Sequence, residues 1–399
     1  MAGGLQPSAD QRSIGEPGPS AATNSSPVGT AAVSAVTSSR PAGCSVAVSL
    51  TVGPTVLPVS VANVRSVAPE PIAGQTVLVT GGAGYIGSHT VRALRAADRP
   101  VVVLDSLELG TADAVIDAPL VVGDIADEAL VEQVCRDHDV GSVVHFAAYK
   151  NVGESMTDPG KYFHNNVDGT VHLVEAVLRA GVQQMVFSSS CSVYGTPPTV
   201  PVDESAPIAP ESVYADTKAM IERVLRWYGM TSGLRAVSLR YFNAAGASVD
   251  SRIGEDWSYA LNLIPVAMRA LLLGDPPQLQ VYGTDYPTPD GTCIRDYIHV
   301  DDLADAHVKS LDHLDRGGDT VEINVGTGIG SSVLEVLNAI GAVAGRPVPH
   351  ELAPRRAGDP VSTYAEPSRA AEVLGWRAAH GLDEIVRTAY AWHLAQLGD

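Results

Sequence analysis

The fold of this chain is decided by the stretch Thr76-Val77-Leu78-Val79-Thr80-Gly81-Gly82-Ala83-Gly84-Tyr85-Ile86-Gly87. Its first five residues form a short, β-branched apolar run, which is typical of a strand buried on both faces. The residues that follow the stretch read as a helix to about Ala97, so Gly81, Gly84 and Gly87 join a strand to a helix. Glycine at such a junction permits a tight turn, and the free N–H groups of the helix suit a pyrophosphate.

The same strand–turn–helix pattern repeats along the chain. Further apolar runs, each ending in small or polar residues, are Val101–Leu104 before Asp105, Leu120–Val122 before Gly123-Asp124, Ser142–Phe146 before Ala147, and Met185–Phe187 before Ser188–Ser190. Short apolar runs that alternate with helices predict an α/β fold with a doubly wound parallel sheet of the Rossmann type. Ligands of such sheets bind at the carboxyl ends of the strands, where these polar residues fall.

Composition divides the chain into three parts. Residues 1–74 contain no aromatic residue and only six charges, so we expect a disordered, low-complexity extension. A secretory signal and a start site assigned too far upstream are the alternatives, although the segment lacks a basic n-region. We expect a dinucleotide-binding domain over residues 75–244. Residues 245–399 are expected to form a smaller, mixed α/β substrate-binding domain that partly returns to the first sheet.

Charge and cysteine content exclude several classes of function. A formal net charge of −19 argues against a nucleic-acid-binding surface. No apolar run reaches the roughly 18 residues of a membrane span. The four cysteines Cys44, Cys135, Cys191 and Cys293 are widely spaced and form no metal or disulfide signature. Isolated thiols suit a reducing cytosol, so we expect a cytoplasmic protein without a metal site.

Asp105 ends the second apolar run, where a carboxylate can accept hydrogen bonds from both hydroxyls of an adenosine ribose. The same charge would repel the additional phosphate of NADP, so the sequence favours NAD as the cofactor. Asp124 and Ile125 follow the third run and are expected beside the adenine. The alternative for Asp105 is that its side chain only caps the next helix.

Tyr214 and Lys218 are four residues apart in a stretch that reads as a helix to Arg226, so they share one face. A free tyrosine has a pKa of about 10, but a nearby ammonium and a positive nicotinamide both favour the phenolate, which can then act as a general base. Ser190, at the end of a predicted strand, is expected to hydrogen-bond the same substrate oxygen. The alternative is a solvated Tyr–Lys pair without a function.

With these residues the chain resembles the extended short-chain dehydrogenase/reductases from about Gln75 to the C-terminus. Within them it is most similar to the epimerases that invert C4 of a UDP-hexose. Besides the glycine-rich turn, which continues into Ser88-His89, the resemblance rests on His145-Phe146-Ala147-Ala148-Tyr149-Lys150, Val152-Gly153-Glu154-Ser155, Asn165-Asn166-Val167-Asp168-Gly169-Thr170, Phe187-Ser188-Ser189-Ser190-Cys191-Ser192-Val193-Tyr194-Gly195, Arg240-Tyr241-Phe242-Asn243, Tyr286–Thr292 with Arg295–Val300, and Ala353–Asp359.

The resemblance implies a site for NAD and a site for a UDP-sugar. The residues implied for NAD are Gly81, Gly84, Tyr85, Ile86, Gly87, Asp105, Ser106, Leu107, Glu108, Leu109, Gly110, Asp124, Ile125, Phe146, Ala147, Ala148, Tyr149, Lys150, Asn166, Tyr214, Lys218 and Phe242. The residues implied for the UDP-sugar are Ser190, Asn243, Asn262, Leu263, Gln280, Val281, Tyr282, Arg295, Arg356, Asp359 and Thr363. Among these, Tyr282 is expected to stack on uracil and the two arginines to neutralise the diphosphate.

The resemblance further implies reversible epimerisation of UDP-glucose and UDP-galactose through a 4-keto intermediate, with tightly bound NAD, in a homodimer paired through parts of residues 167–180 and 215–226. The chain departs from the family pattern at Val213, where proline is common, at Asp216, and at Ala148, where glycine is frequent. Thr363 stands where a bulky tyrosine is associated with small hexoses only. We therefore hypothesise that N-acetylated UDP-sugars are also accepted.

Other functions on the same fold are distinguished by single positions. A 4,6-dehydratase would place an Asp-Glu pair where Cys191 and Ser192 stand, so elimination of water is not expected. A UDP-pentose or UDP-uronate 4-epimerase stays open, because only loosely defined pocket residues differ. A non-catalytic NAD-sensing protein typically lacks the Tyr or the Lys, and both are present. Cys191, His145 and His299 are expected to pack or to form structural hydrogen bonds.

Overall fold

The computed structural model describes residues 75–258, 260–356 and 358–398. The extension expected over residues 1–74, and with it the alternative of a signal segment, lies outside the described residues. Within the described ranges, none of the helices is both long enough and apolar enough to span a membrane.

Seven parallel strands form the central sheet, in the order β10-β6-β5-β4-β1-β2-β3. The strands are β1 (Thr76–Thr80), β2 (Val101–Asp105), β3 (Leu120–Val122), β4 (Val140–His145), β5 (Gln184–Ser188), β6 (Arg235–Tyr241) and β10 (Val321–Val325). The predicted doubly wound sheet is confirmed, and each predicted run coincides with a strand to within two residues. Because β1 pairs with both β2 and β4, the chain winds outward from β1 in both directions. This topology opens a crevice at the carboxyl ends of β1 and β4.

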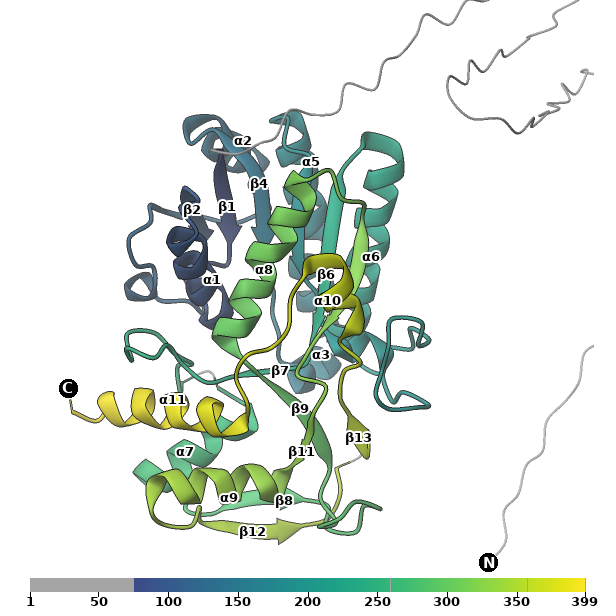
Figure 1. Ribbon diagram of the computed structural model, residues 1–399. Coiled ribbons are helices and arrows are strands. Elements are labelled where there is room, and N and C mark those ends of the chain that lie inside the picture. The colour runs from purple at the N-terminus through teal and green to yellow at the C-terminus, as the bar shows by residue number, and fades with distance from the viewer. Residues whose placement is uncertain (1–74, 259, 357, 399) are drawn as a thin grey trace, which may run out of the picture. The chain divides into compact units, whose positions relative to one another are not determined.

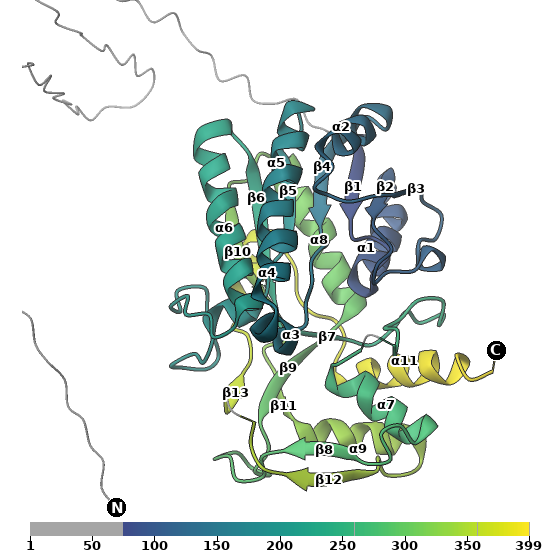
Figure 2. The ribbon, with the colours of Figure 1, turned by 180° about the vertical axis from the view of Figure 1, so that it is seen from behind.

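Helices cover both faces of the central sheet (Figure 1). One face carries α1 (Tyr85–Ala96), α8 (Val300–Asp315) and α10 (Ser368–Leu374). The other face, seen from behind in Figure 2, carries α2 (Glu128–Asp137), α5 (Gly169–Arg179) and α6 (Val213–Ser232). Val77 and Val79 of β1 lie in the core on the first side, and Leu78 lies in the core on the second. Successive side chains of a strand point to opposite faces, so a strand covered on both sides must be apolar throughout.

Shorter helical segments connect these elements. They are the 3₁₀ turns η1 (Ala112–Ala114) and η3 (Cys191–Tyr194), the helices α3 (Val152–Thr157) and α4 (Pro159–Tyr162), and the π-helical stretch η2 (Phe163–Asp168) that leads into α5.

A smaller part of the molecule lies beyond the carboxyl ends of the central strands (Figure 1). Its strands are β7 (Asn243–Ala245), β9 (Ile294–His299), β11 (Gly330–Ser332) and β13 (Ser362–Thr363) in one mixed sheet, and β8 (Leu279–Tyr282) with β12 (His350–Ala353) in a second. Its helices are α7 (Leu263–Leu273), α9 (Val333–Ala344) and α11 (Leu382–Ala395), which share a core with both sheets. The chain passes between the two parts several times, because β10, α8 and α10 follow β7 in sequence and pack on the central sheet.

One ion pair is buried between α6 and β6. Arg240 donates to the Glu222 carboxylate from Nε at 2.9 Å and from Nη2 at 2.6 Å, and neither side chain is more than 4% exposed. The Ser189 hydroxyl, just after β5, donates to the same carboxylate at 2.6 Å. Arg240 also donates to the hydroxyl of Tyr194 at 3.0 Å. The pair therefore fixes the end of β5 against α6.

We expect Arg240→Met to lower the free energy of unfolding by about 3–5 kcal/mol, because the Glu222 carboxylate then stays buried without its cation. Arg240→Met combined with Glu222→Leu should recover most of this loss, since no uncompensated charge remains. Urea unfolding followed by circular dichroism measures both variants. Equal destabilisation of the single and the double variant would contradict the expected role of the pair.

Candidate functional site

The turn between β1 and α1 requires glycine at two positions. Gly81 has a φ of +73°, and a Cβ there would lie 2.5 Å from the backbone nitrogen of Ala147, just after β4. A Cβ on Gly87 would lie 2.2 Å from the carbonyl oxygen of Gly81. Gly84 is the N-cap of α1, which has no side-chain cap. The N–H groups of the first helical turn therefore stay open, and the turn has the form of a cradle for an anionic group.

Asp105 holds this turn from the end of β2. Its carboxylate accepts from the N–H of Ala83 at 2.9 Å and from the N–H of Leu107 at 2.9 Å. The alternative that it caps the next helix is wrong, because the next helical turn begins only at Ala112 and its N-cap is Thr111. A carboxylate can accept about four hydrogen bonds, so two positions remain for a ligand.

The other residues expected at the cofactor gather at the carboxyl ends of neighbouring strands. Residues 106–110 follow β2, Asp124 and Ile125 follow β3, residues 146–150 follow β4, and Phe242 follows β6. The Tyr149 hydroxyl donates to Glu108 Oε2 at 2.6 Å and so joins the loops after β2 and β4. Asn166, which is fully buried, exchanges hydrogen bonds with the backbone N–H and C=O of Tyr149 at 2.9 and 3.1 Å.

Tyr214 and Lys218 lie one turn apart on α6, and both are buried. The alternative of a solvated surface pair is therefore wrong. Lys218 Nζ lies 5.8 Å from the centre of the Tyr214 ring and donates to the carbonyl oxygen of Ser188 at 2.8 Å. Ser190, two residues further along, accepts from the N–H of Ser192 at 3.2 Å and from its hydroxyl at 2.9 Å. The fold thus brings the phenol, the amine and the hydroxyl to the end of β5.

Burial determines the acid–base behaviour of this group. It raises the pKa of Tyr214 well above its ordinary value, an effect to which Tyr241 adds and which the Ser190 hydroxyl opposes. Burial also lowers the pKa of Lys218 to about 7, against the opposite influence of the Glu222 carboxylate. At neutral pH Lys218 therefore carries only part of a charge, and Tyr214 is a neutral phenol. Within the protein alone, burial therefore favours the neutral form of the Tyr214 phenol.

His145 and Cys191 lie close to this group. The His145 ring nitrogens bond to Thr80 Oγ1 at 2.7 Å and to Thr170 Oγ1 at 2.9 Å, and burial lowers the pKa of His145 to about 3. Burial raises the pKa of the Cys191 thiol to about 12, so it is not a nucleophile at neutral pH. Across the described ranges no group of three or more His, Cys, Asp or Glu residues is arranged to hold a metal ion.

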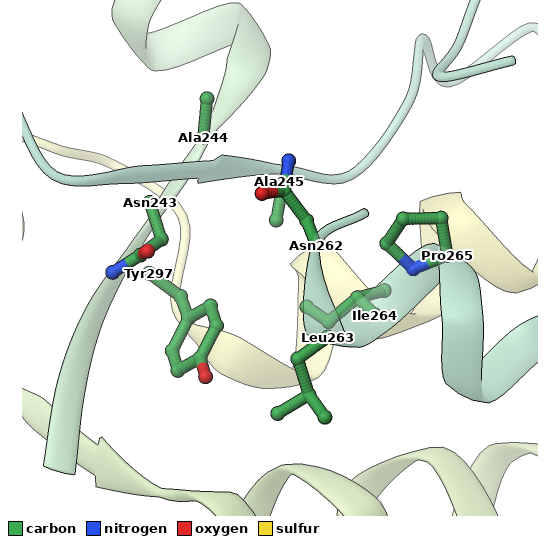
Figure 3. A pocket seen from close by; sticks show the side chains of 8 residues that line it. All are labelled: Asn243, Ala244, Ala245, Asn262, Leu263, Ile264, Pro265 and Tyr297. Atoms are coloured by element: carbon green, nitrogen blue, oxygen red, sulfur yellow. The ribbon is translucent and has the colours of Figure 1, made fainter. Parts of the chain in front are cut away.

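A pocket opens between β7, β9 and the start of α7 (Figure 3). It is lined by Asn243, Ala244, Ala245, Asn262, Leu263, Ile264, Pro265 and Tyr297. Asn243 is fixed by a hydrogen bond from its Nδ2 to the carbonyl oxygen of Asp296, at 2.9 Å. Asn262 is the N-cap of α7, yet its side chain makes no capping hydrogen bond. The start of α7 therefore presents backbone N–H groups without side-chain partners beside the pocket.

Cationic and aromatic groups expected at the substrate gather near β9 and β13. Arg356 Nε donates to Asp359 at 2.9 Å, and Arg295 Nη2 lies 3.9 Å from the same carboxylate. The Arg356 guanidinium carbon lies 4.8 Å from the centre of the Tyr282 ring. Thr363 pairs with Arg295 in the mixed sheet, and its buried hydroxyl has no hydrogen-bond partner in the described part of the chain.

Gln280 and Val281 lie before Tyr282 on β8, which pairs with β12. Val281 is buried, and the Gln280 side chain donates to Glu351 on β12. Tyr282 is 37% exposed, so its ring is open to a ligand.

Glu255 was not expected at the site from the sequence. Its Oε1 accepts from Asn262 Nδ2 at 3.0 Å and from Lys150 Nζ at 3.4 Å, and thus contacts two of the expected site residues. No signal in the sequence marks it, because it is a single acidic residue in the irregular segment between β7 and α7.

Comparison with known proteins identifies relatives along most of the chain. The sequence model of the NAD dependent epimerase/dehydratase family matches residues 77–326. A UDP-glucose 4-epimerase of Azospirillum brasilense is 50% identical over 322 residues, which cover 80% of this chain and 92% of that protein. The crystal structure of UDP-glucose 4-epimerase from Brucella ovis in complex with NAD is 46% identical, with a TM-score of 0.78, and the match covers 80% of this chain and 98% of that one. The UDP-Glc/GlcNAc 4-epimerase from Campylobacter jejuni is 39% identical, with a TM-score of 0.72, over 81% of this chain and 100% of that one.

Proposed function

The chain belongs to the NAD dependent epimerase/dehydratase family, and on this basis we propose that it interconverts UDP-glucose and UDP-galactose by inverting C4 of the hexose. It is an NAD-dependent isomerase. The observation that carries the proposal is the position of Tyr214, Lys218 and Ser190, which lie at the same edge of the central sheet as the glycine cradle.

The cradle fits NAD, because glycine stands where a Cβ would fill the turn and the first turn of α1 has no side-chain cap. NAD bound there supplies the acceptor that takes hydride from C4 and the donor that returns it. We assign the cofactor mainly to residues 75–244 and the UDP-sugar mainly to residues 245–399. Two unused acceptor positions on Asp105 suit the hydroxyls of the adenosine ribose.

Tyr214 is the general base in this proposal. Burial holds its pKa high, so it gives up its proton only when a positive charge lies beside its oxygen, and that charge comes with the oxidised cofactor. The Tyr214 phenolate takes the proton of the C4 hydroxyl as C4 is oxidised to the ketone. Ser190 would donate a hydrogen bond to the same oxygen, and Lys218, which donates to the carbonyl of Ser188, would hold the nicotinamide ribose when NAD is bound.

Inversion requires that the 4-keto sugar turns about its link to the diphosphate before hydride returns. The protein must therefore hold the nucleotide firmly and the hexose loosely. Arg295 and Arg356 supply guanidinium groups for the diphosphate, and the Tyr282 ring offers an aromatic face to uracil. In this proposal Asp359, which now accepts from Arg356, accepts from the uridine ribose when the nucleotide binds.

The competing functions differ in what they need at these positions. Cys191 and Ser192 provide no carboxylates for a 4,6-dehydratase, and burial keeps the pKa of the Cys191 thiol high, at about 12. A non-catalytic NAD sensor would not need both Tyr214 and Lys218 buried at the cofactor edge. A UDP-pentose or UDP-uronate 4-epimerase uses the same catalytic group, and a substrate series distinguishes it.

We further propose a cytoplasmic homodimer, paired through parts of residues 167–180 and 215–226. Two large apolar side chains lie on α6 directly after residue 226 and would extend this interface along the helix, since Trp227 is 65% exposed and Met230 is 64% exposed. Exposed apolar groups close together on one helix are typical of a surface covered by a partner.

The purified protein should convert UDP-galactose to UDP-glucose without added NAD, because the cofactor stays bound through the cycle. Proton NMR of the anomeric signals follows the reaction to its equilibrium mixture. Acid release from the protein should yield about one NAD per chain. Absence of conversion, both with and without added NAD, would refute the proposed function.

Tyr214→Phe should lower kcat by roughly a thousandfold, because it removes the group that takes the C4 hydroxyl proton in the transition state. Affinity for UDP-glucose, measured by calorimetry, should change by less than about threefold, since binding of the nucleotide does not use this group. Near-normal turnover in this variant would rule out Tyr214 as the base.

We further propose that UDP-N-acetylgalactosamine is also a substrate, because the small residue Thr363 stands where, in similar epimerases, a bulky tyrosine is associated with small hexoses only. Thr363→Tyr should lower kcat/KM for the N-acetylated sugar by about tenfold or more, through steric exclusion of about 1.4 kcal/mol or more, and leave UDP-galactose within about threefold. Thr363→Ser serves as the control that keeps the hydroxyl and the space. Failure of the unaltered protein to convert UDP-N-acetylgalactosamine, with UDP-galactose active, would contradict this extension.

A further inference from the structure

The loop after β2 arches away from the glycine turn and returns to it. At the start of the loop, Asp105 accepts from the N–H of Ala83 at 2.9 Å. At its end, the N–H of Thr111 donates to the carbonyl oxygen of Ala83 at 3.2 Å. Residues 106–110 are therefore anchored at both ends on one residue of the turn, and Glu108 lies at the middle of the arch.

Tyr149, in the loop after β4, is restrained from two sides. The buried Asn166 side chain accepts from the N–H of Tyr149 at 2.9 Å and donates to its carbonyl oxygen at 3.1 Å. Lys161 Nζ lies 4.0 Å from the centre of the Tyr149 ring, in a cation–π contact, and the Glu154 carboxylate holds that ammonium at 2.9 Å. Because both the backbone and the ring of Tyr149 are held, the direction of its hydroxyl is fixed.

The Tyr149 hydroxyl meets the arch at Glu108. It donates to Glu108 Oε2 at 2.6 Å. Burial, with the Glu108 carboxylate adding to its effect, raises the pKa of Tyr149 to about 12, so the hydroxyl keeps its proton at neutral pH and acts as the donor. Hydrogen bonds to ionised carboxylates are among the stronger ones in proteins. This contact therefore joins two loops that are otherwise anchored separately.

The contact between Tyr149 and Glu108 crosses the carboxyl end of β1. In the central sheet β1 lies between β2 and β4, so a bond from the β2 loop to the β4 loop passes over the strand that leads into the glycine turn. Gly82 and Ala83 of that turn are buried, whereas Tyr149 is half-buried and Glu108 is exposed. The contact therefore lies between the turn and the solvent.

We propose that Tyr149 and Glu108 form a latch across the dinucleotide site, and that this latch slows the release of NAD by holding the loops after β2 and β4 together on the solvent side. The inference rests on the proposed function, because that function places NAD in the glycine cradle and needs it to stay bound through each cycle. In this arrangement the two residues are positioning residues for their loops. The time that NAD stays bound then depends on their contact with each other, in addition to any contact that each makes with NAD.

Two simpler roles for these residues make different predictions. If each only contacts NAD, a change at Tyr149 has the same effect on NAD release whether or not residue 108 carries a carboxylate. If the hydrogen bond only stabilises the two loops of the folded chain, a change at Tyr149 lowers the free energy of unfolding and leaves the rate of NAD release unchanged. A latch instead makes the effects of the two changes on the release rate depend on each other.

The test is a double-mutant cycle in which the rate of NAD release is measured. The four proteins are the unaltered chain, Tyr149→Phe, Glu108→Ala, and the two changes combined, each purified with its cofactor and loaded with radiolabelled NAD. Excess unlabelled NAD is then added, and the label that each protein retains after rapid desalting is followed over time. Phenylalanine keeps the ring beneath Lys161 and removes only the hydroxyl. Comparing Tyr149→Phe within each background cancels the lost charge of Glu108.

Tyr149→Phe should raise the rate of NAD release by about fivefold when Glu108 is present, because the latch loses its hydrogen bond. In the Glu108→Ala background the same change should alter the rate by less than about 1.5-fold, since no bond remains to be lost. An equal effect in the two backgrounds, including no effect in either, would overturn the inference. A chain that neither retains NAD nor epimerises UDP-galactose would instead overturn the proposed function.

Asp113→Ala is the matched control, since Asp113 is an exposed carboxylate just beyond the same loop. In that background Tyr149→Phe should again raise the release rate by about fivefold, and loss of the effect there would overturn the inference. If Glu108→Ala does not hold NAD through purification, Glu108→Gln takes its place in the same cycle. Its neutral amide accepts a weaker hydrogen bond, so Tyr149→Phe should then raise the rate by about twofold. An effect as large as that in the unaltered chain would overturn the inference.

Discussion

The close approach of two backbones at the centre of the sheet is the constraint on which the site depends. Gly81, after β1, lies so near Ala147, after β4, that even a methyl group does not fit between them. The loops of the two strands therefore meet where the strand order reverses. Asp105 ties the turn to β2, and Asn166 ties the β4 loop to η2 through Tyr149.

Five of the seven strands of the central sheet could be predicted, because strands covered on both sides are mainly apolar and runs like Val101–Leu104 stand out in a sequence for that reason. β6 and β10 were not predicted, since polar residues such as Arg240 and Glu322 interrupt their apolar runs. The location of the cofactor site could be predicted from topology. Parallel strands place their carboxyl ends at one edge of the sheet, and Asp105 and Ser190 both lie at or after such ends. The Tyr214–Lys218 pair was predicted from helical spacing together with the serine cluster Ser188–Ser190 at the end of a predicted strand.

The parts of the site that the sequence did not indicate depend on contacts between segments that are far apart in sequence. Glu255 contacts Lys150 across a separation of 105 residues, and no local sequence pattern indicates that contact. The pKa shifts of Lys218 and Tyr214 could likewise not be predicted from the sequence. Lys218 was expected to acidify Tyr214 as a full ammonium, whereas burial lowers its pKa to about 7 and raises that of the phenol. Burial is a property of the folded chain, so spacing could not indicate which effect dominates.

The late position of β10 in the sequence has a consequence for folding of the chain during its synthesis. β10 pairs along the outer edge of β6. Between these two strands in the sequence lie β9, a strand of the mixed sheet, and helix α8. A nascent chain leaving the ribosome must therefore carry an unpaired, apolar strand edge until Val321–Val325 has been synthesised. Residues 75–244 alone therefore lack β10, one edge strand of the central sheet. Holding that edge apart from other nascent chains is the kind of protection that chaperones provide.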